Sequence, residues 1–81
     1  MKVIRISAVW CSSCIIMKSR FNDVIKSKNI DIEDLDYDLD DIEKYKIGDI
    51  LPVYIKYDGS KEVSRLIGEH TKEEIENFIG E

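Results

Sequence analysis

The sequence predicts an α/β fold with a four-stranded mixed sheet flanked by helices. An apolar, β-branched run at Val3–Val9 is followed by apolar residues at helical spacing. A strictly alternating segment, Asp34–Asp40, comes next, and Asp58-Gly59 then separates two strand-like runs before a final helical pattern. The predicted order is β-α-β-(α)-β-β-α. We expect the whole chain, residues 1–81, to form one domain because it is short and has no linker.

The first two elements are a buried strand and an amphipathic helix. Val3–Val9 is almost continuously apolar, which is typical of a strand covered on both faces. Met17, Phe21 and Val24 then recur at helical spacing. This pattern predicts a helix over about residues 12–28 with one apolar face.

The next segment, Asp34–Asp40, alternates with a period of two. Leu35, Tyr37 and Leu39 would lie on one face of a strand, with four aspartates on the other. A calcium site would need ligands that converge from a glycine-containing turn. We therefore predict a solvated strand at the edge of the sheet, where its charges prevent pairing with another chain.

The second half of the chain predicts a short helix and a hairpin. Asp41–Lys46 fits a short helix that ends before Gly48. Val53–Tyr57 and Glu62–Ile67 read as antiparallel strands joined at the turn Asp58-Gly59.

A capping box, Thr71-Lys72-Glu73-Glu74, predicts the start of a last helix. Ile75, Phe78 and Ile79 would line its inner face, and Gly80 would end it. Because a strand–helix–strand unit needs a parallel pair and a hairpin an antiparallel one, the sheet should be mixed.

The charge balance excludes several classes of partner. The chain carries 17 acidic and 12 basic residues, for a net charge of −5. Nucleic acids and anionic membrane surfaces both require a concentrated basic surface, so we expect neither as a partner. Met1–Arg5 is too short and too charged for a signal-peptide core. We expect a cytoplasmic monomer without a bound cofactor.

The only two cysteines lie three positions apart in Trp10-Cys11-Ser12-Ser13-Cys14, where the predicted strand gives way to the helix. In the cytoplasm, two close thiols are more often catalytic or metal-binding than a structural disulfide. Their placement favours a dithiol that cycles with a disulfide.

Three features together resemble the thioredoxin superfamily. They are Trp10-Cys11-Ser12-Ser13-Cys14 after the first strand, Leu51-Pro52-Val53 at the start of the hairpin, and Gly68 after it. The resemblance covers nearly the whole chain but begins at the family's second strand, so it describes a minimal version of glutaredoxin size. It implies a thioredoxin-like fold and a thiol–disulfide oxidoreductase that reduces protein disulfides.

The resemblance also implies roles for the two thiols. Disulfide exchange proceeds by thiolate attack through a mixed disulfide. Free backbone N–H groups and the positive end of the helix dipole would stabilise a thiolate at Cys11. Cys11 would therefore be the nucleophile and Cys14 the resolving thiol.

The remaining site residues would contact substrate. The resemblance implies a cis Leu51-Pro52 bond beside the dithiol, Trp10 as a lid, and Gly68 as a point of close backbone approach. Ser12 and Ser13 either donate to the Cys11 thiolate or simply favour the first helical turn. The lone histidine, His70, is interpreted as a surface or capping residue.

Two departures from the family refine this prediction. Arg5 stands where thioredoxins carry a buried aspartate; the cation would either favour thiolates near the dithiol or reach water, and we favour the second. The glutaredoxin residues around the proline and after the hairpin are missing, since Ile50-Leu51 and Gly68-Glu69 stand there. We therefore expect protein disulfides rather than glutathione as substrate, and a thioredoxin-reductase-like flavoprotein as electron donor.

Three alternatives stay open. The pair Cys11 and Cys14 could form half of a zinc site completed by a second chain, because tetrahedral zinc needs four ligands and this chain offers two thiols and a distant His70. The chain could also be a binding module without redox activity, or a glutathione-coupled enzyme.

Overall fold

A computed structural model describes residues 1–80 and contains one four-stranded sheet in the order β2-β1-β3-β4. Strand β1 runs parallel to β2 and antiparallel to β3, and β3 and β4 form the hairpin. The predicted element order and the mixed sheet are therefore confirmed. The strands are β1 (Lys2–Ser7), β2 (Asp31–Asp36), β3 (Val53–Asp58) and β4 (Lys61–Ile67); the helices are α1 (Ser12–Ile25), the 3₁₀ turn η1 (Glu43–Tyr45) and α2 (Lys72–Gly80).

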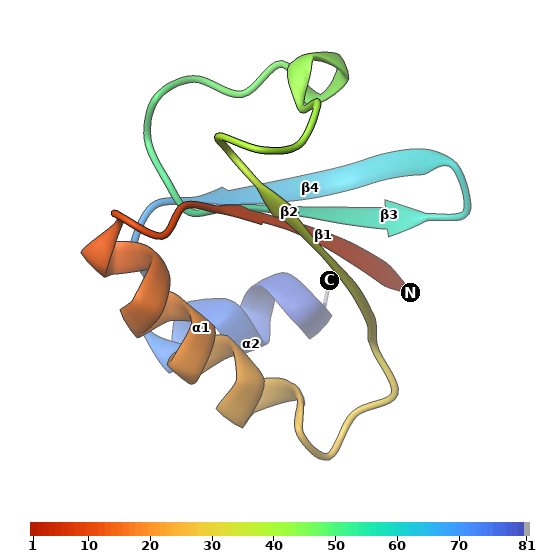
Figure 1. Ribbon diagram of the computed structural model, residues 1–81. Helices are drawn as coiled ribbons and strands as arrows, with labels where there is room; N and C mark the ends of the chain where they lie inside the picture. Colours follow the sequence, from red (N-terminus) through yellow and green to blue (C-terminus); the bar gives the residue numbers. More distant parts are fainter. Residues whose placement is uncertain (81) are drawn as a thin grey trace.

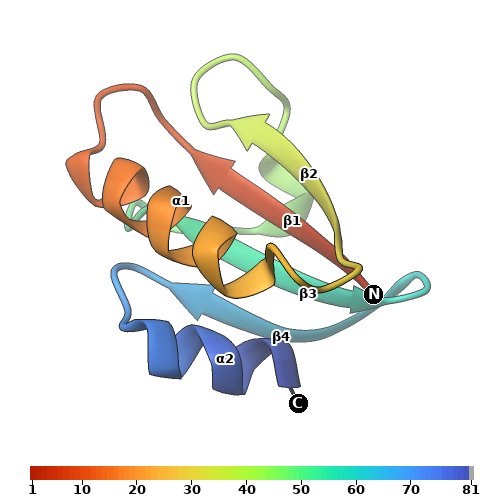
Figure 2. The same ribbon diagram turned by 90° about the horizontal axis from the view of Figure 1, so that it is seen from below.

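Both α-helices cover the same face of the sheet, as Figure 1 shows. The connection from β2 to β3, which includes η1, lies on the opposite face. Figure 2 shows α1 crossing the sheet from the end of β1 towards the start of β2, which is the connection that makes these strands parallel.

Each face of the sheet has its own buried cluster. On the helix side, Phe21 of α1 stacks on Tyr54 of β3, with ring centroids 4.4 Å apart. On the other side, apolar residues of β1 and β3 pack with Tyr45 of η1. Both cysteines belong to this second cluster, so the dithiol lies at the edge of a packed core.

The alternating segment is only partly a strand. Strand β2 ends at Asp36, and residues 37–40 form a turn. The Asp36 carboxylate accepts hydrogen bonds from the backbone N–H groups of Asp38 (2.8 Å) and Leu39 (3.1 Å), which bends the chain out of the sheet. Leu39 is consequently 85% exposed, and its predicted place on an apolar strand face is wrong. The prediction that this strand lies at the sheet edge is confirmed.

The boundaries of three other elements shift. The first strand ends at Ser7 rather than Val9, and α1 ends at Ile25, three residues before the predicted end. The short helix contracts to Glu43–Tyr45 because Lys46 adopts a left-handed conformation with φ 51°. The Asp41 carboxylate accepts the N–H of Glu43 at 3.3 Å, although the N-cap position of η1 is occupied by Ile42, whose side chain cannot accept a hydrogen bond.

The hairpin turn and the capping box both form, and the turn lies one residue later than predicted. Asp58 pairs with Lys61, so Gly59 and Ser60 are the two central residues, and Gly59 adopts φ 64°. Thr71 and Glu74 exchange hydrogen bonds at the start of α2: the Thr71 N–H donates to the Glu74 carboxylate (3.0 Å), and the Glu74 N–H donates to the Thr71 hydroxyl (3.2 Å).

Candidate active site

The two cysteines occupy the start of α1, where four residues separate the helix from the end of β1. Cys11 is the N-cap residue, and its backbone N–H donates to the Ala8 carbonyl at 3.2 Å. Its sulfur in turn accepts the N–H of Cys14, with a distance of 3.2 Å from that nitrogen to Sγ. Cysteine thus does at this helix start what serine or aspartate usually does.

The two thiols are free and differ in environment. Cys11 is 9% exposed and Cys14 is 5% exposed. Burial, with a smaller contribution from the neighbouring Cys11, raises the pKa of Cys14 to about 11. Cys14 is therefore a protonated thiol at neutral pH, and it must lose a proton before it can act as a nucleophile.

The proline segment packs against the dithiol. Leu51 belongs to the same buried cluster as both cysteines. The Leu51-Pro52 peptide bond is cis, as the resemblance implies. The Gly68 N–H donates to the Pro52 carbonyl at 2.8 Å, and Gly68 adopts φ 85°, which explains why glycine stands there.

Trp10 is held beside the turn that follows β2. Its indole N–H donates to the Asp38 carboxylate at 2.7 Å, and its ring meets Tyr37 edge to face, with centroids 6.1 Å apart. The side chain is 61% exposed, so it presents an apolar surface next to Cys11. Sequence reasoning missed Tyr37 and Asp38; the only available signal was the alternating segment that contains them.

Ser12, Ser13 and His70 contribute less than the other candidates. Ser12 is exposed and Ser13 is half-buried, and within residues 1–80 neither hydroxyl forms a hydrogen bond with Cys11. The His70 ring contacts the Ile67 carbonyl (2.8 Å) and the Glu74 carboxylate (3.2 Å). His70 therefore joins the end of β4 to the start of α2, in agreement with a capping role.

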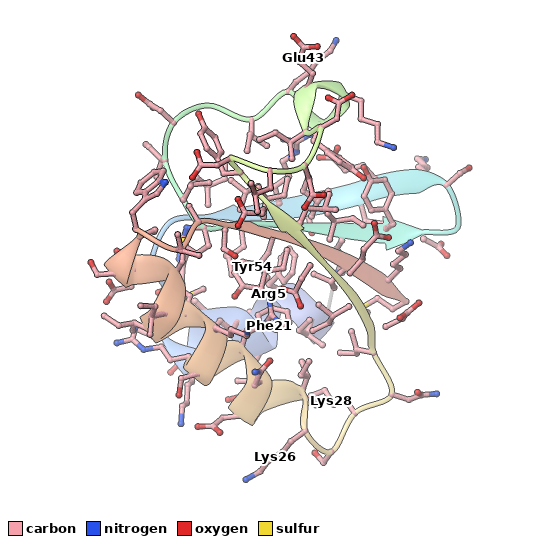
Figure 3. All side chains as sticks on the ribbon, viewed as in Figure 1. Arg5, Phe21, Lys26, Lys28, Glu43 and Tyr54 are labelled. Atoms are coloured by element: carbon pink, nitrogen blue, oxygen red, sulfur yellow. The ribbon has the colours of Figure 1, made fainter. Side chains whose placement is uncertain are left out.

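The prediction that Arg5 reaches water is wrong. Its side chain is 6% exposed and lies between the sheet and the helices, next to Phe21 and Tyr54 in Figure 3. The guanidinium donates to both oxygens of Asp34, at 2.5 Å and 3.0 Å, and to Asn22 of α1 at 3.1 Å. These partners satisfy the cation inside the fold, so it has no need to reach solvent.

The Arg5 guanidinium and burial change the pKa values of two neighbouring side chains. The Arg5 hydrogen bonds lower the pKa of Asp34. Burial raises the pKa of Tyr54 to about 12 despite the nearby guanidinium. An arginine remains protonated at any ordinary pH, so Arg5 cannot accept a proton from Cys14.

A small cavity of about 180 Å³ opens beside Cys14. Ser7, Lys18 and Asp36 line it together with the cysteine. Sequence reasoning placed Asp36 on a solvated strand face and did not connect it with the dithiol. Asp36 pairs in register with Ser7, which lies only four residues before Cys11; the parallel pairing of β1 and β2 therefore supplies the connection.

Within residues 1–80, no group of three or more histidine, cysteine, aspartate or glutamate side chains is arranged to hold a metal ion. A zinc site at Cys11 and Cys14 would therefore need ligands from another chain. The helices of this part of the chain are also too short or too polar to cross a lipid bilayer.

Comparisons with solved structures agree with this architecture. A thioredoxin-2 described as a component of the malaria parasite protein secretion machinery superposes with a TM-score of 0.86 at 18% identity, over 98% of this chain and 80% of that one. The reduced thioredoxin pre-protein of Schistosoma mansoni gives 0.83 at 21% identity, over 98% and 75%. Thioredoxin 1 of Thermosipho africanus gives 0.81 at 25% identity, over 99% and 91%.

Sequence comparison adds no narrower assignment, since no protein-family model and no curated protein matches the chain. The mixed sheet with its hairpin, the helix after β1 and the superpositions all agree with the fold that the resemblance implies. The chain therefore has the thioredoxin fold, the fold of these solved thioredoxin structures.

Proposed function

We propose that this protein is a thiol–disulfide oxidoreductase that reduces protein disulfides through Cys11 and Cys14. The observation that carries the proposal is the contact between the Cys14 N–H and the Cys11 sulfur at the N-terminus of α1. A backbone donor and the positive end of a 14-residue helix both favour the anionic form of that sulfur. Cys11 is therefore the attacking thiolate.

The reaction has two steps. The Cys11 thiolate attacks one sulfur of the substrate disulfide, and the other substrate sulfur leaves as a thiolate that takes up a proton. Cys14 then loses its proton and attacks Cys11, so that the Cys11–Cys14 bond forms and the bond from Cys11 to the substrate breaks. The substrate gains two electrons and the dithiol is oxidised to a disulfide. A thioredoxin-reductase-like flavoprotein would return these electrons in the cytoplasm.

The surroundings of the dithiol suit an extended polypeptide. Trp10, Ile15 and Ile50 are large apolar side chains that are more than half exposed, and each lies within four residues of Cys11 or of Pro52. Exposed apolar side chains that gather around a site are a feature of protein–protein interaction surfaces, and we take these three as the contact surface for a protein substrate. The cis Leu51-Pro52 segment would offer backbone groups to the same substrate.

Glutathione fits this surface less well. Glu69 follows Gly68 directly and is about half exposed, with its carboxylate 3.4 Å from the Arg20 guanidinium. Its negative charge opposes a ligand that carries two carboxylates of its own.

The test is reduction of insulin disulfides with dithiothreitol as electron source, followed by the turbidity of the released chains. The wild-type protein should accelerate the reaction, and Cys11→Ser should not. In a separate reaction of pre-reduced protein with insulin, without dithiothreitol, Cys14→Ser should accumulate a mixed disulfide between Cys11 and the substrate, detected by mass spectrometry under non-reducing conditions. Ser27→Ala is the matched control, since it changes an exposed serine after the far end of α1, away from the dithiol, and should leave turnover intact. Equal rates with wild-type protein and Cys11→Ser would overturn the proposal.

A further inference from the structure

The resolving step of the proposed reaction needs a proton acceptor, and Arg5 cannot supply one. Cys14 is 5% exposed and protonated at neutral pH. A buried thiol reacts only after it has lost its proton, so a base near Cys14 would accelerate the second step. The cavity of about 180 Å³ beside Cys14 is where such a base can act, because it connects the thiol with polar groups of β1, β2 and α1.

Asp36 is the only carboxylate among the residues that line this cavity. Its oxygen Oδ1 accepts the N–H groups of Asp38 and Leu39, which fixes the orientation of the carboxylate. Within residues 1–80, its other oxygen, Oδ2, has no hydrogen-bond partner. One oxygen is thus held by the turn, and the other remains available to accept a proton.

The neighbouring carboxylates are already engaged. Asp38 accepts the Trp10 indole N–H, and Asp40 accepts the backbone N–H of Asp36. Asp34, two residues before Asp36, is paired with Arg5. Each of these groups has a structural partner to lose if it takes up a proton, whereas the free oxygen of Asp36 has none.

Other charged groups also lie around the cavity. Lys18 lies on the wall formed by α1, one helical turn after Cys14. Its ammonium group attracts both the carboxylate and the thiolate that forms at Cys14. Arg5 and Asp34 form an ion pair on the neighbouring strands β1 and β2, so their charges largely cancel. Asp38 and Asp40 lie in the turn after β2, where they carry negative charges.

We propose that Asp36 accepts the proton of Cys14, directly or through a water molecule in this cavity, as Cys14 attacks the mixed disulfide. A water molecule takes up about 30 Å³ in the liquid, so the cavity has room for such a relay. The protonated Asp36 then returns its proton, through solvent, to the substrate thiolate that leaves. This assignment rests on the proposed oxidoreductase function.

The experiment is a single-turnover reaction of the reduced protein with dithiobis-nitrobenzoate, whose thiolate product is coloured. Attack by Cys11 releases the first equivalent at a rate that depends on reagent concentration. Resolution by Cys14 releases the second at a rate that does not. The two steps are therefore measured in one trace.

Asp36→Asn should leave the first phase unchanged and slow the second about 100-fold at neutral pH, the lower end of what a positioned general base contributes. Asparagine keeps an oxygen for the turn but cannot accept the proton. The pH dependence gives a second readout. The wild-type second phase should change little near neutral pH, whereas that of the variant should rise about tenfold per pH unit with the thiolate fraction of Cys14.

Asp40→Asn is the matched control, because it removes the same charge from the same turn outside the cavity, and both of its phases should match wild type. Equal second phases in Asp36→Asn and Asp40→Asn would overturn this inference while leaving the proposed function intact. Failure of the wild-type protein to release a second equivalent would overturn both. If Asp36→Asn impairs the first phase as well, Asp36→Glu is the deciding variant. A steep pH dependence of its second phase, despite the retained carboxylate, would overturn the role of Asp36.

Discussion

The ion pair between Arg5 and Asp34 joins β1 to β2, and Arg5 also donates to Asn22 of α1, so replacing Asp34 with asparagine should destabilise the fold. The guanidinium side chain is 6% exposed, whereas the Asp34 side chain is 54% exposed. Breaking a fully buried ion pair costs about 3–5 kcal/mol, and an exposed pair is worth less than about 1 kcal/mol.

Because one partner is buried and the other is half in water, we expect a loss of about 1–2 kcal/mol for Asp34→Asn. In the variant, Asn22 still accepts one hydrogen bond from Arg5. The loss should therefore stay below the cost of breaking a fully buried ion pair. In a domain of this size, each 1 kcal/mol lowers the melting temperature by about 4–8 °C.

The pH dependence of this loss follows from the lowered pKa of Asp34 in the folded state. The carboxylate contributes its full stabilisation above the unfolded pKa, which is about 3.9 for aspartate, and loses it as the pH falls through the lower folded value. The difference between wild type and Asp34→Asn should therefore be largest at neutral pH and shrink in acid.

Urea unfolding followed by far-UV circular dichroism at neutral and acidic pH measures both quantities. Glu33→Gln is the matched control on the same strand, since it breaks a pair with Lys2 in which both side chains are nearly half exposed (45% and 46%). That control should change the free energy of unfolding by less than about 0.5 kcal/mol. An effect of Asp34→Asn no larger than the control, or one that persists in acid, would refute the reasoning.

Three further predictions concern backbone, helix start and substrate. Gly68→Ala should cost about 1–2 kcal/mol because φ 85° is unfavourable for a side chain. Gly48→Ala, with nothing within 4 Å of the added carbon, should stay within about 0.5 kcal/mol; equal urea midpoints for the two variants would contradict this account. Thr71→Ala should lose about 1 kcal/mol by removing the cap on Glu74, measured by thermal unfolding; an unchanged midpoint would be inconsistent with a functional cap. A reductase-coupled assay should show no robust turnover with glutathione as the only reductant, and robust turnover would reject the protein-disulfide preference.

Elements defined by local signals were predictable from the sequence. The apolar run before Cys11, the capping box at Thr71 and the Asp58-Gly59 turn each depend on residues within a few positions of one another. The fold followed from their order, because a strand–helix–strand unit and a hairpin leave few arrangements of four strands. The position of the two cysteines at the start of α1 was predictable in the same way, because they come soon after the apolar strand.

Features that depend on long-range contacts or on local competition were not predictable. Arg5 is buried because Asp34, 29 residues away in the chain, and Asn22 together satisfy its charge. Strand β2 stops at Asp36 because that side chain binds the next turn, although the alternating pattern fits a longer strand equally well. Lys56 lies within the predicted strand Val53–Tyr57, but no local signal indicated that it would be 2% exposed and would donate to the Phe78 carbonyl of α2 at 2.6 Å.

The central claim is that Cys11 and Cys14 form a redox-active pair, and the reduction potential of that pair tests it most directly. Equilibration of the protein in a series of dithiol and disulfide buffers, followed through the fluorescence of Trp10, gives the midpoint. We predict a reversible two-electron transition near the thioredoxin value of about −270 mV. A midpoint near about −200 mV would contradict the reducing direction, and the absence of any reversible transition would contradict the redox function itself.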